Sequence, residues 1–180
     1  MFKADASEFN GVGFPDGTML DLSVIWELTN GGPRRPLGIK LVVPGRVVDA
    51  WQPFETAYGT DGGEGAITSR GALDEMTKDA SRLKTLDVDA ASFVMSDADG
   101  DGNVDTIEFE NGFGDGAFPM SRGLDAAGVL VGLVVWDSRL PWRLGVPEGT
   151  PPLDVTIRED RYLDCMSGKR PVVNGRCHVA

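Results

Sequence analysis

Histidine and cysteine are scarce in this chain of 180 residues, which has one histidine, His178, and two cysteines, Cys165 and Cys177. A single histidine excludes zinc motifs that take two histidines from this chain, such as H-E-x-x-H. A Ser-His-Asp triad would need a histidine on the C-terminal tail, where chains are usually mobile. The two cysteines are either free thiols or paired across a C-terminal hairpin that turns at Asn174-Gly175, which requires an oxidising compartment.

Positive charge and long apolar runs are also lacking. The chain has 17 basic and 28 acidic residues, so its net charge is 17 − 28 = −11. This charge repels phosphate backbones, so we expect no nucleic-acid partner. The longest nearly polar-free run, residues 129–136, is far shorter than the roughly 20 residues that span a bilayer. Because residues 1–5 have no apolar signal-peptide core, we expect a cytoplasmic protein, or a secreted one whose signal has been removed.

Glycine and proline are plentiful, with 24 and 11 residues, and they separate short apolar segments. This pattern predicts a mainly β (α+β) fold, either an antiparallel β-sandwich or a curved sheet. The expected strands are residues 20–28, 37–43, 47–54, 92–95, 106–110, 117–122 and 129–136, with weaker candidates at 153–157 and 171–179. A hairpin turn is expected at residues 124–128.

One helix is expected at residues 70–83, packed on the sheet, with Ser69 as its N-cap. Its core-facing residues at helical spacing are Leu73, Met76, Ala80 and Leu83. We expect one mostly β domain at residues 1–146. Residues 147–180 then form a C-terminal arm or hairpin packed on the same domain, after a linker-like stretch at 147–152.

An acidic loop at residues 97–108 follows the spacing of a calcium-binding loop. The predicted ligands at positions 1, 3, 5, 7, 9 and 12 are Asp97, Asp99, Asp101, the Asn103 carbonyl, Asp105 and Glu108. Gly102 falls at position 6, where such a loop turns sharply. So many carboxylates repel one another unless a hard cation neutralises them, and Ca²⁺ accepts six to eight oxygens in a flexible shell.

The flanks of this loop look extended, because glycines and Pro119 follow it and exclude a helix. The expected setting is strand-loop-strand, which resembles the calcium loops of integrin-like β-propeller repeats. The alternative is a solvated acidic turn without metal, since aspartate, asparagine and glycine favour turns in any case.

Two further segments resemble a bacterial family, domain of unknown function 4241. The first runs from Tyr58 to Gly65 and is followed by Ala72-Leu73-Asp74. The second runs from Asn111 to Pro119 and is followed by residues 122–128. The resemblance covers roughly Leu20 to Asp137 and implies a mostly β domain without an established activity.

A second group of carboxylates would matter if the fold brought its members together at one end of the sheet. Its members are Asp61, Glu64, Asp74 and Asp115. Such a cluster would bind another cation or serve acid–base chemistry. Asp115 has a purely structural alternative, in which its side chain accepts backbone N–H groups in a tight turn.

These features favour a non-catalytic acidic β domain that is stabilised by one Ca²⁺ and binds a protein partner. Its net charge favours a basic partner, such as a toxin neutralised in an immunity-type role, although an acidic surface also serves solubility. The alternative is a metal-assisted hydrolase that uses the second carboxylate group. The absence of a nucleophile motif favours the binding domain.

Overall fold

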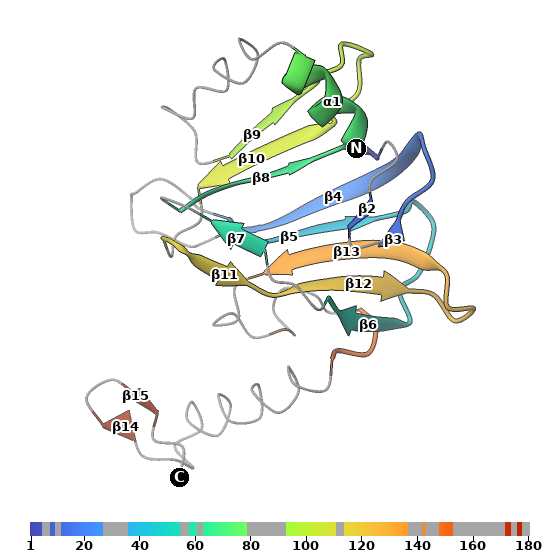
Figure 1. The fold of residues 1–180 in the computed structure, drawn as a ribbon. Coiled ribbons are helices and arrows are strands. Elements are labelled where there is room, and N and C mark those ends of the chain that lie inside the picture. The colour runs from blue at the N-terminus through green and yellow to red at the C-terminus, as the bar shows by residue number, and fades with distance from the viewer. Residues whose placement is uncertain are drawn as a thin grey trace.

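The structure, a computed structural model, describes residues 1–4, 8–9, 12–26, 36–54, 58–60, 63–78, 93–110, 114–136, 142, 148–152, 172–173 and 176–177. Strands dominate these residues, and a short helix, α1 (Arg70–Lys78), accompanies them (Figure 1). The mainly β, α+β fold predicted from the sequence is confirmed. In the described part of the chain, no helix is both long enough and apolar enough to cross a membrane.

The largest sheet has six strands in the order β1-β4-β5-β13-β12-β6, and each neighbouring pair is antiparallel. In that order the strands are β1 (Phe2–Ala4), β4 (Thr18–Trp26), β5 (Pro36–Val42), β13 (Leu130–Trp136), β12 (Met120–Leu124) and β6 (Ala50–Pro53). The predicted turn between β12 and β13 is confirmed. Asp125 donates its N–H to the Val129 carbonyl at 2.9 Å, and Gly128 takes the left-handed φ of +77°.

A second, three-stranded sheet has the antiparallel order β8-β10-β9. Its strands are β8 (Glu64–Thr68), β10 (Thr106–Glu110) and β9 (Phe93–Ser96). Three two-stranded pairs complete the described strands. They are β7 (Tyr58–Thr60) with β11 (Gly116–Phe118), β2 (Glu8–Phe9) with β3 (Val12–Gly13), and β14 (Val172–Val173) with β15 (Arg176–Cys177).

The main core joins the two larger sheets. Alternate residues of the three-stranded sheet, Ile67, Ile107 and Phe109, are buried in one apolar cluster with residues of the six-stranded sheet. Those residues of the larger sheet include Leu41 and Leu133. Because side chains alternate along a strand, the opposite face of the small sheet carries Thr106, Glu108 and Glu110.

A second core cluster lies on the other face of the six-stranded sheet, where Val134 packs with Trp51, Val48 and Trp142. Trp51 and Trp142 meet edge to face, with ring centroids 5.8 Å apart. Gly123 and Gly132 are opposite each other in the β12–β13 pair, and a Cβ at either position would crowd Trp51 and Val48.

Residues 148–152 are held on this second face. Thr150 forms two backbone hydrogen bonds with the chain around β6: the Trp51 N–H donates to the Thr150 carbonyl, and the Thr150 N–H donates to the Asp49 carbonyl, both at 2.8 Å. The Trp51 indole N–H donates to the Glu148 carbonyl at 2.9 Å, and Lys40 pairs with Glu148. The stretch that looked linker-like is therefore bonded to β6. Of the weaker strand candidates, 153–157 lies outside the described residues, whereas 171–179 contains β14 and β15.

The single strand predicted at 117–122 is wrong, because this stretch forms two strands in different sheets. Phe118, at the end of β11, lies opposite Tyr58 of β7, whereas Met120, at the start of β12, lies opposite Val135 of β13. Pro119 separates them and has no N–H to continue a ladder.

The start of α1 agrees with the sequence, but the predicted burial of Leu73 does not. Ser69 caps the helix as predicted, because its Oγ accepts the Ala72 N–H at 3.1 Å and its carbonyl accepts that of Leu73 at 3.0 Å. Ala72 is fully buried, whereas Leu73 is 45% exposed, so the core-facing role predicted for Leu73 is wrong. Residues 79–83 and the side chain of Met76 lie outside what the structure describes.

Candidate metal centre

The acidic loop connects β9 to β10, so the predicted strand-loop-strand setting is confirmed. Ser96 and Thr106 face each other where the two strands meet, and Asp105 N–H donates to the Ser96 carbonyl at 3.1 Å. The loop is therefore closed at its base by the ladder of the small sheet. Val104, in the loop, is partly buried and packs against the main core.

Asp97 organises the first half of the loop. Its Oδ1 accepts the N–H groups of Gly100 and Asp101 at 2.7 and 3.1 Å, and its Oδ2 accepts that of Gly102 at 2.7 Å. These contacts draw the chain around the carboxylate, which requires tight turns. Gly100 and Gly102 supply them with φ values of +81° and +90°, a region that glycine adopts without strain.

Asp105 lies in the second half of the loop, where it is fully buried, and its side chain holds residues of the first half. Its two carboxylate oxygens accept the N–H groups of Ala98 and Asp99 at 2.9 and 3.1 Å. Asp101 instead bonds to its neighbour: its Oδ1 accepts both the backbone and the side-chain N–H of Asn103, at 2.9 and 3.0 Å.

The loop gathers three of the predicted ligands. One carboxylate oxygen from each of Asp97, Asp99 and Asp105 lies within 4.8 Å of the other two. Two oxygens bound to one Ca²⁺ at about 2.3–2.6 Å lie at most about 5 Å apart, so the three can share one ion. Asp101 and Glu108 are not members of this group. The predicted ligand set is therefore brought together only in part.

Glu108 lies on β10, on the face opposite the core. Its Oε2 is buried and has no hydrogen-bond partner among the described residues. Burial raises the pKa of Glu108, and the nearby charge of Glu64 raises it further. The hydroxyls of Ser96 and Thr106 are also buried without a hydrogen-bond partner in this part of the structure. This face of the small sheet thus holds several buried oxygens next to the base of the loop.

The second carboxylate group does not assemble among the described residues, and Asp61 lies outside them. Glu64 begins β8, whereas Asp74 lies on α1 beyond the other end of that strand and pairs with Arg70 at 3.3 Å. Asp115 accepts the Gly63 N–H at 3.1 Å, which is the structural role considered for it. Within the described chain, only the group of Asp97, Asp99 and Asp105 has three acidic side chains close enough to share an ion.

Sequence reasoning missed Ser69 as a neighbour of the loop. Its N–H donates to the Asp105 carbonyl at 2.8 Å, which ties the start of α1 to position 9 of the loop. No local pattern signals this contact, because the two residues are 36 positions apart and meet only through the pairing of β8 with β10.

Comparison of the chain with models of known protein families, with curated proteins and with solved structures gave no match. The resemblance to domain of unknown function 4241 stays a prediction.

Proposed function

We propose that the protein is a non-catalytic β domain that binds one Ca²⁺ in the loop of residues 97–108 and is stabilised by it. One observation carries this proposal: Asp97, Asp99 and Asp105 each place a carboxylate oxygen within 4.8 Å of the other two. Three negative charges at this separation repel one another, and a divalent cation removes that repulsion.

The chemistry of the donors favours Ca²⁺. All the side chains are hard oxygen donors, and no sulfur or imidazole belongs to the group. The loop offers Asp101 and the Asn103 carbonyl as further oxygens at the expected spacing. A loop with many oxygens suits the larger and more flexible shell of Ca²⁺ better than the strict octahedron of Mg²⁺, and a micromolar to millimolar affinity is expected.

Thermal unfolding with and without Ca²⁺ tests the proposal. Ca²⁺ should raise the melting temperature of the wild type, because a ligand of the folded state stabilises that state. Asp97→Asn should remove most of this rise, since it removes the charge and one of the two oxygens that accept loop N–H groups and are available to the ion. Asp74→Asn is the matched control, because it removes the same charge from exposed α1 and should respond like the wild type. Equal responses of all three proteins would contradict the site.

The role of such a domain is, in our proposal, to bind a basic protein partner, as in an immunity-type complex. The net charge of −11 supports this, because one Ca²⁺ neutralises only two of these charges and the remainder attracts positive surfaces. Complex formation should be strong at low salt and lost in 0.5 M salt, where the Debye length is about 4 Å. Retention of the partner in 0.5 M salt would contradict a charge-driven interface.

The hydrolase alternative has no comparable support. The described members of its carboxylate group do not come close enough together to share an ion. Asp74 is in an ion pair, and Asp115 accepts a backbone N–H. Turnover of a phosphoester or glycoside by the purified protein would reopen it.

A further inference from the structure

Asp105 belongs to both the loop and the attachment of α1. Its side chain holds the N–H groups of Ala98 and Asp99, and its own N–H donates to the Ser96 carbonyl. Its carbonyl accepts the Ser69 N–H at 2.8 Å. Both Asp105 and Ser69 are fully buried. A shift of Asp105 therefore reaches both arms of the loop and the residue before α1.

Ser69 in turn fixes the first turn of α1. Its hydroxyl and its carbonyl accept the N–H groups of Ala72 and Leu73, at 3.1 and 3.0 Å. Figure 1 places α1 beside the end of the small sheet where β10 begins, as the contact between Ser69 and Asp105 requires. The loop is thus connected to the helix through Asp105 and Ser69, which are hydrogen-bonded to each other.

We propose that Ca²⁺ in the loop strengthens the attachment of α1 to the sheet through Asp105 and Ser69. This inference rests on the proposed calcium site. Without an ion, the charge of buried Asp105 is opposed by Asp97 and Asp99, which favours its movement away from them. With an ion, each of the three carboxylates is attracted to the cation, which offsets their repulsion of one another. Each carboxylate oxygen has two lone pairs, so Asp105 can bind the ion and keep its bonds to Ala98 and Asp99.

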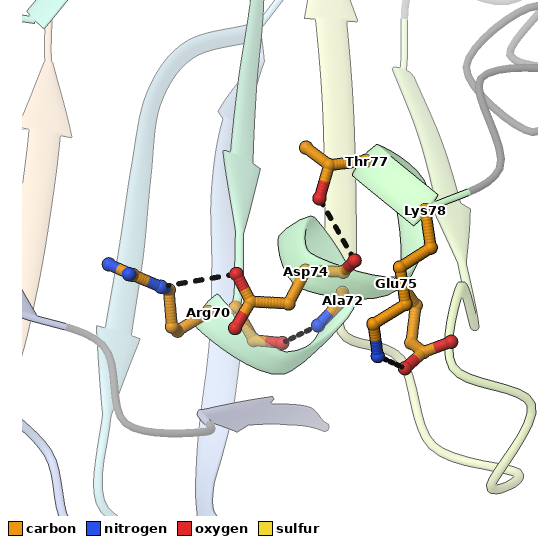
Figure 2. Close-up of polar contacts among 7 residues, drawn as sticks. Arg70, Ala72, Asp74, Glu75, Thr77 and Lys78 are labelled. Carbon is orange, nitrogen blue, oxygen red and sulfur yellow. Dashed lines mark hydrogen bonds and ion pairs between the residues drawn. The ribbon is translucent and has the colours of Figure 1, made fainter.

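The surface under this control is the outer face of α1. It carries the ion pairs Arg70–Asp74 and Lys78–Glu75 (Figure 2). Leu73, next to Asp74, is 45% exposed. Ca²⁺ would then determine whether this surface is held in a fixed position on the sheet.

The coupling is reciprocal, because an ion that stabilises the attached helix must bind more tightly when the helix is attached. The effect of Ca²⁺ on the helix and the effect of the helix on Ca²⁺ affinity can therefore be measured separately. Hydrogen exchange of the full chain measures the effect of Ca²⁺ on the helix. Ca²⁺ should slow exchange of the Ala72 and Leu73 amides about fivefold or more, in the usual range of coupling between sites. Unchanged exchange at these amides, in protein that binds Ca²⁺, would overturn the proposal and leave the calcium site standing.

Calorimetric titration of Ca²⁺ into helix-cap variants measures the effect of the helix on Ca²⁺ affinity. Ser69→Ala should weaken Ca²⁺ binding about three- to tenfold, and Ser69→Thr, which keeps the hydroxyl, should restore most of it. Thr77→Ala removes a hydroxyl contact at the far end of α1, to the Asp74 carbonyl, and should bind like the wild type. Wild-type affinity in Ser69→Ala would overturn the coupling alone, whereas absence of binding in the wild type would overturn the site and the coupling together. If Ser69→Ala does not fold, the exchange of the wild type decides.

Discussion

Glu64 lies diagonally across the β8–β10 pair from Glu108, on the same face of the small sheet. Burial raises the pKa of Glu108, and the charge of Glu64 adds to this rise. The folded protein therefore holds a proton on Glu108 more tightly than the unfolded chain does. As the pH rises from the ordinary glutamate pKa through the raised one, the folded state loses stability, because it must accept a charge that it disfavours.

Replacing Glu108 by glutamine should remove this loss of stability, because glutamine carries no charge at any pH. The free energy of unfolding, measured in EDTA, should rise at neutral pH, whereas near pH 3 the change should be small because the carboxyl is already protonated. Glu64→Gln should raise the free energy of unfolding less, since it removes the charge beside Glu108 but not the burial of Glu108. Denaturant unfolding at the two pH values checks this. A destabilised Glu108→Gln at neutral pH would show that the Glu108 charge has a partner that holds it.

Asp115 has a structural role, which a pair of variants can isolate. Asp115→Ala removes the acceptor of the Gly63 N–H and should cost about 0.5–1.5 kcal/mol, the usual net value of one hydrogen bond. Asp115→Asn keeps an acceptor oxygen and should cost less. Neither should change Ca²⁺ affinity, because Asp115 is not part of the group in the loop. Urea unfolding and calorimetry measure the two quantities, and loss of Ca²⁺ binding in Asp115→Asn would contradict the assignment.

Gly123 lets the second core cluster approach the sheet. A Cβ there would lie 2.9 Å from Cγ2 of Val48 and 3.0 Å from Cζ3 of Trp51, both side chains being buried. Gly123→Ala should therefore destabilise the protein by about 1–3 kcal/mol. Gly59→Ala, in β7, is the control, because its Cβ meets nothing within 4 Å and its stability should stay within about 0.5 kcal/mol of the wild type. Urea unfolding compares them, and equal costs would mean that the core near Trp51 can expand.

Local patterns predicted the parts of the fold that depend on neighbours in sequence. The strands β4 and β5, the turn at Gly128 and the cap at Ser69 all follow from short-range chemistry. The spacing of Asp97, Asp99 and Asp105 likewise follows the geometry of one loop, and these are the ligands that the structure gathers.

Long-range pairing decided the features that the sequence did not reveal. The residues before Pro119 pair with β7, and those after it pair with β13. Only the tertiary fold shows this division of one stretch into two strands. Leu73 was assigned to the core by helical spacing, yet it is exposed and its smaller neighbour Ala72 is buried. Glu108 occupies position 12 of the loop pattern, but in a strand-loop-strand setting the ladder of β10 with β8 and β9 fixes its backbone, so it stays outside the group of three.

Calorimetric titration of Ca²⁺ into the wild-type protein tests the central claim most directly. The loop of Asp97, Asp99 and Asp105 predicts saturable binding of one Ca²⁺ per chain, with a dissociation constant in the micromolar to millimolar range and a strong loss of affinity in Asp97→Asn. No saturable heat in excess Ca²⁺, or unchanged affinity in Asp97→Asn, would mean that the loop is an acidic turn held by its own hydrogen bonds.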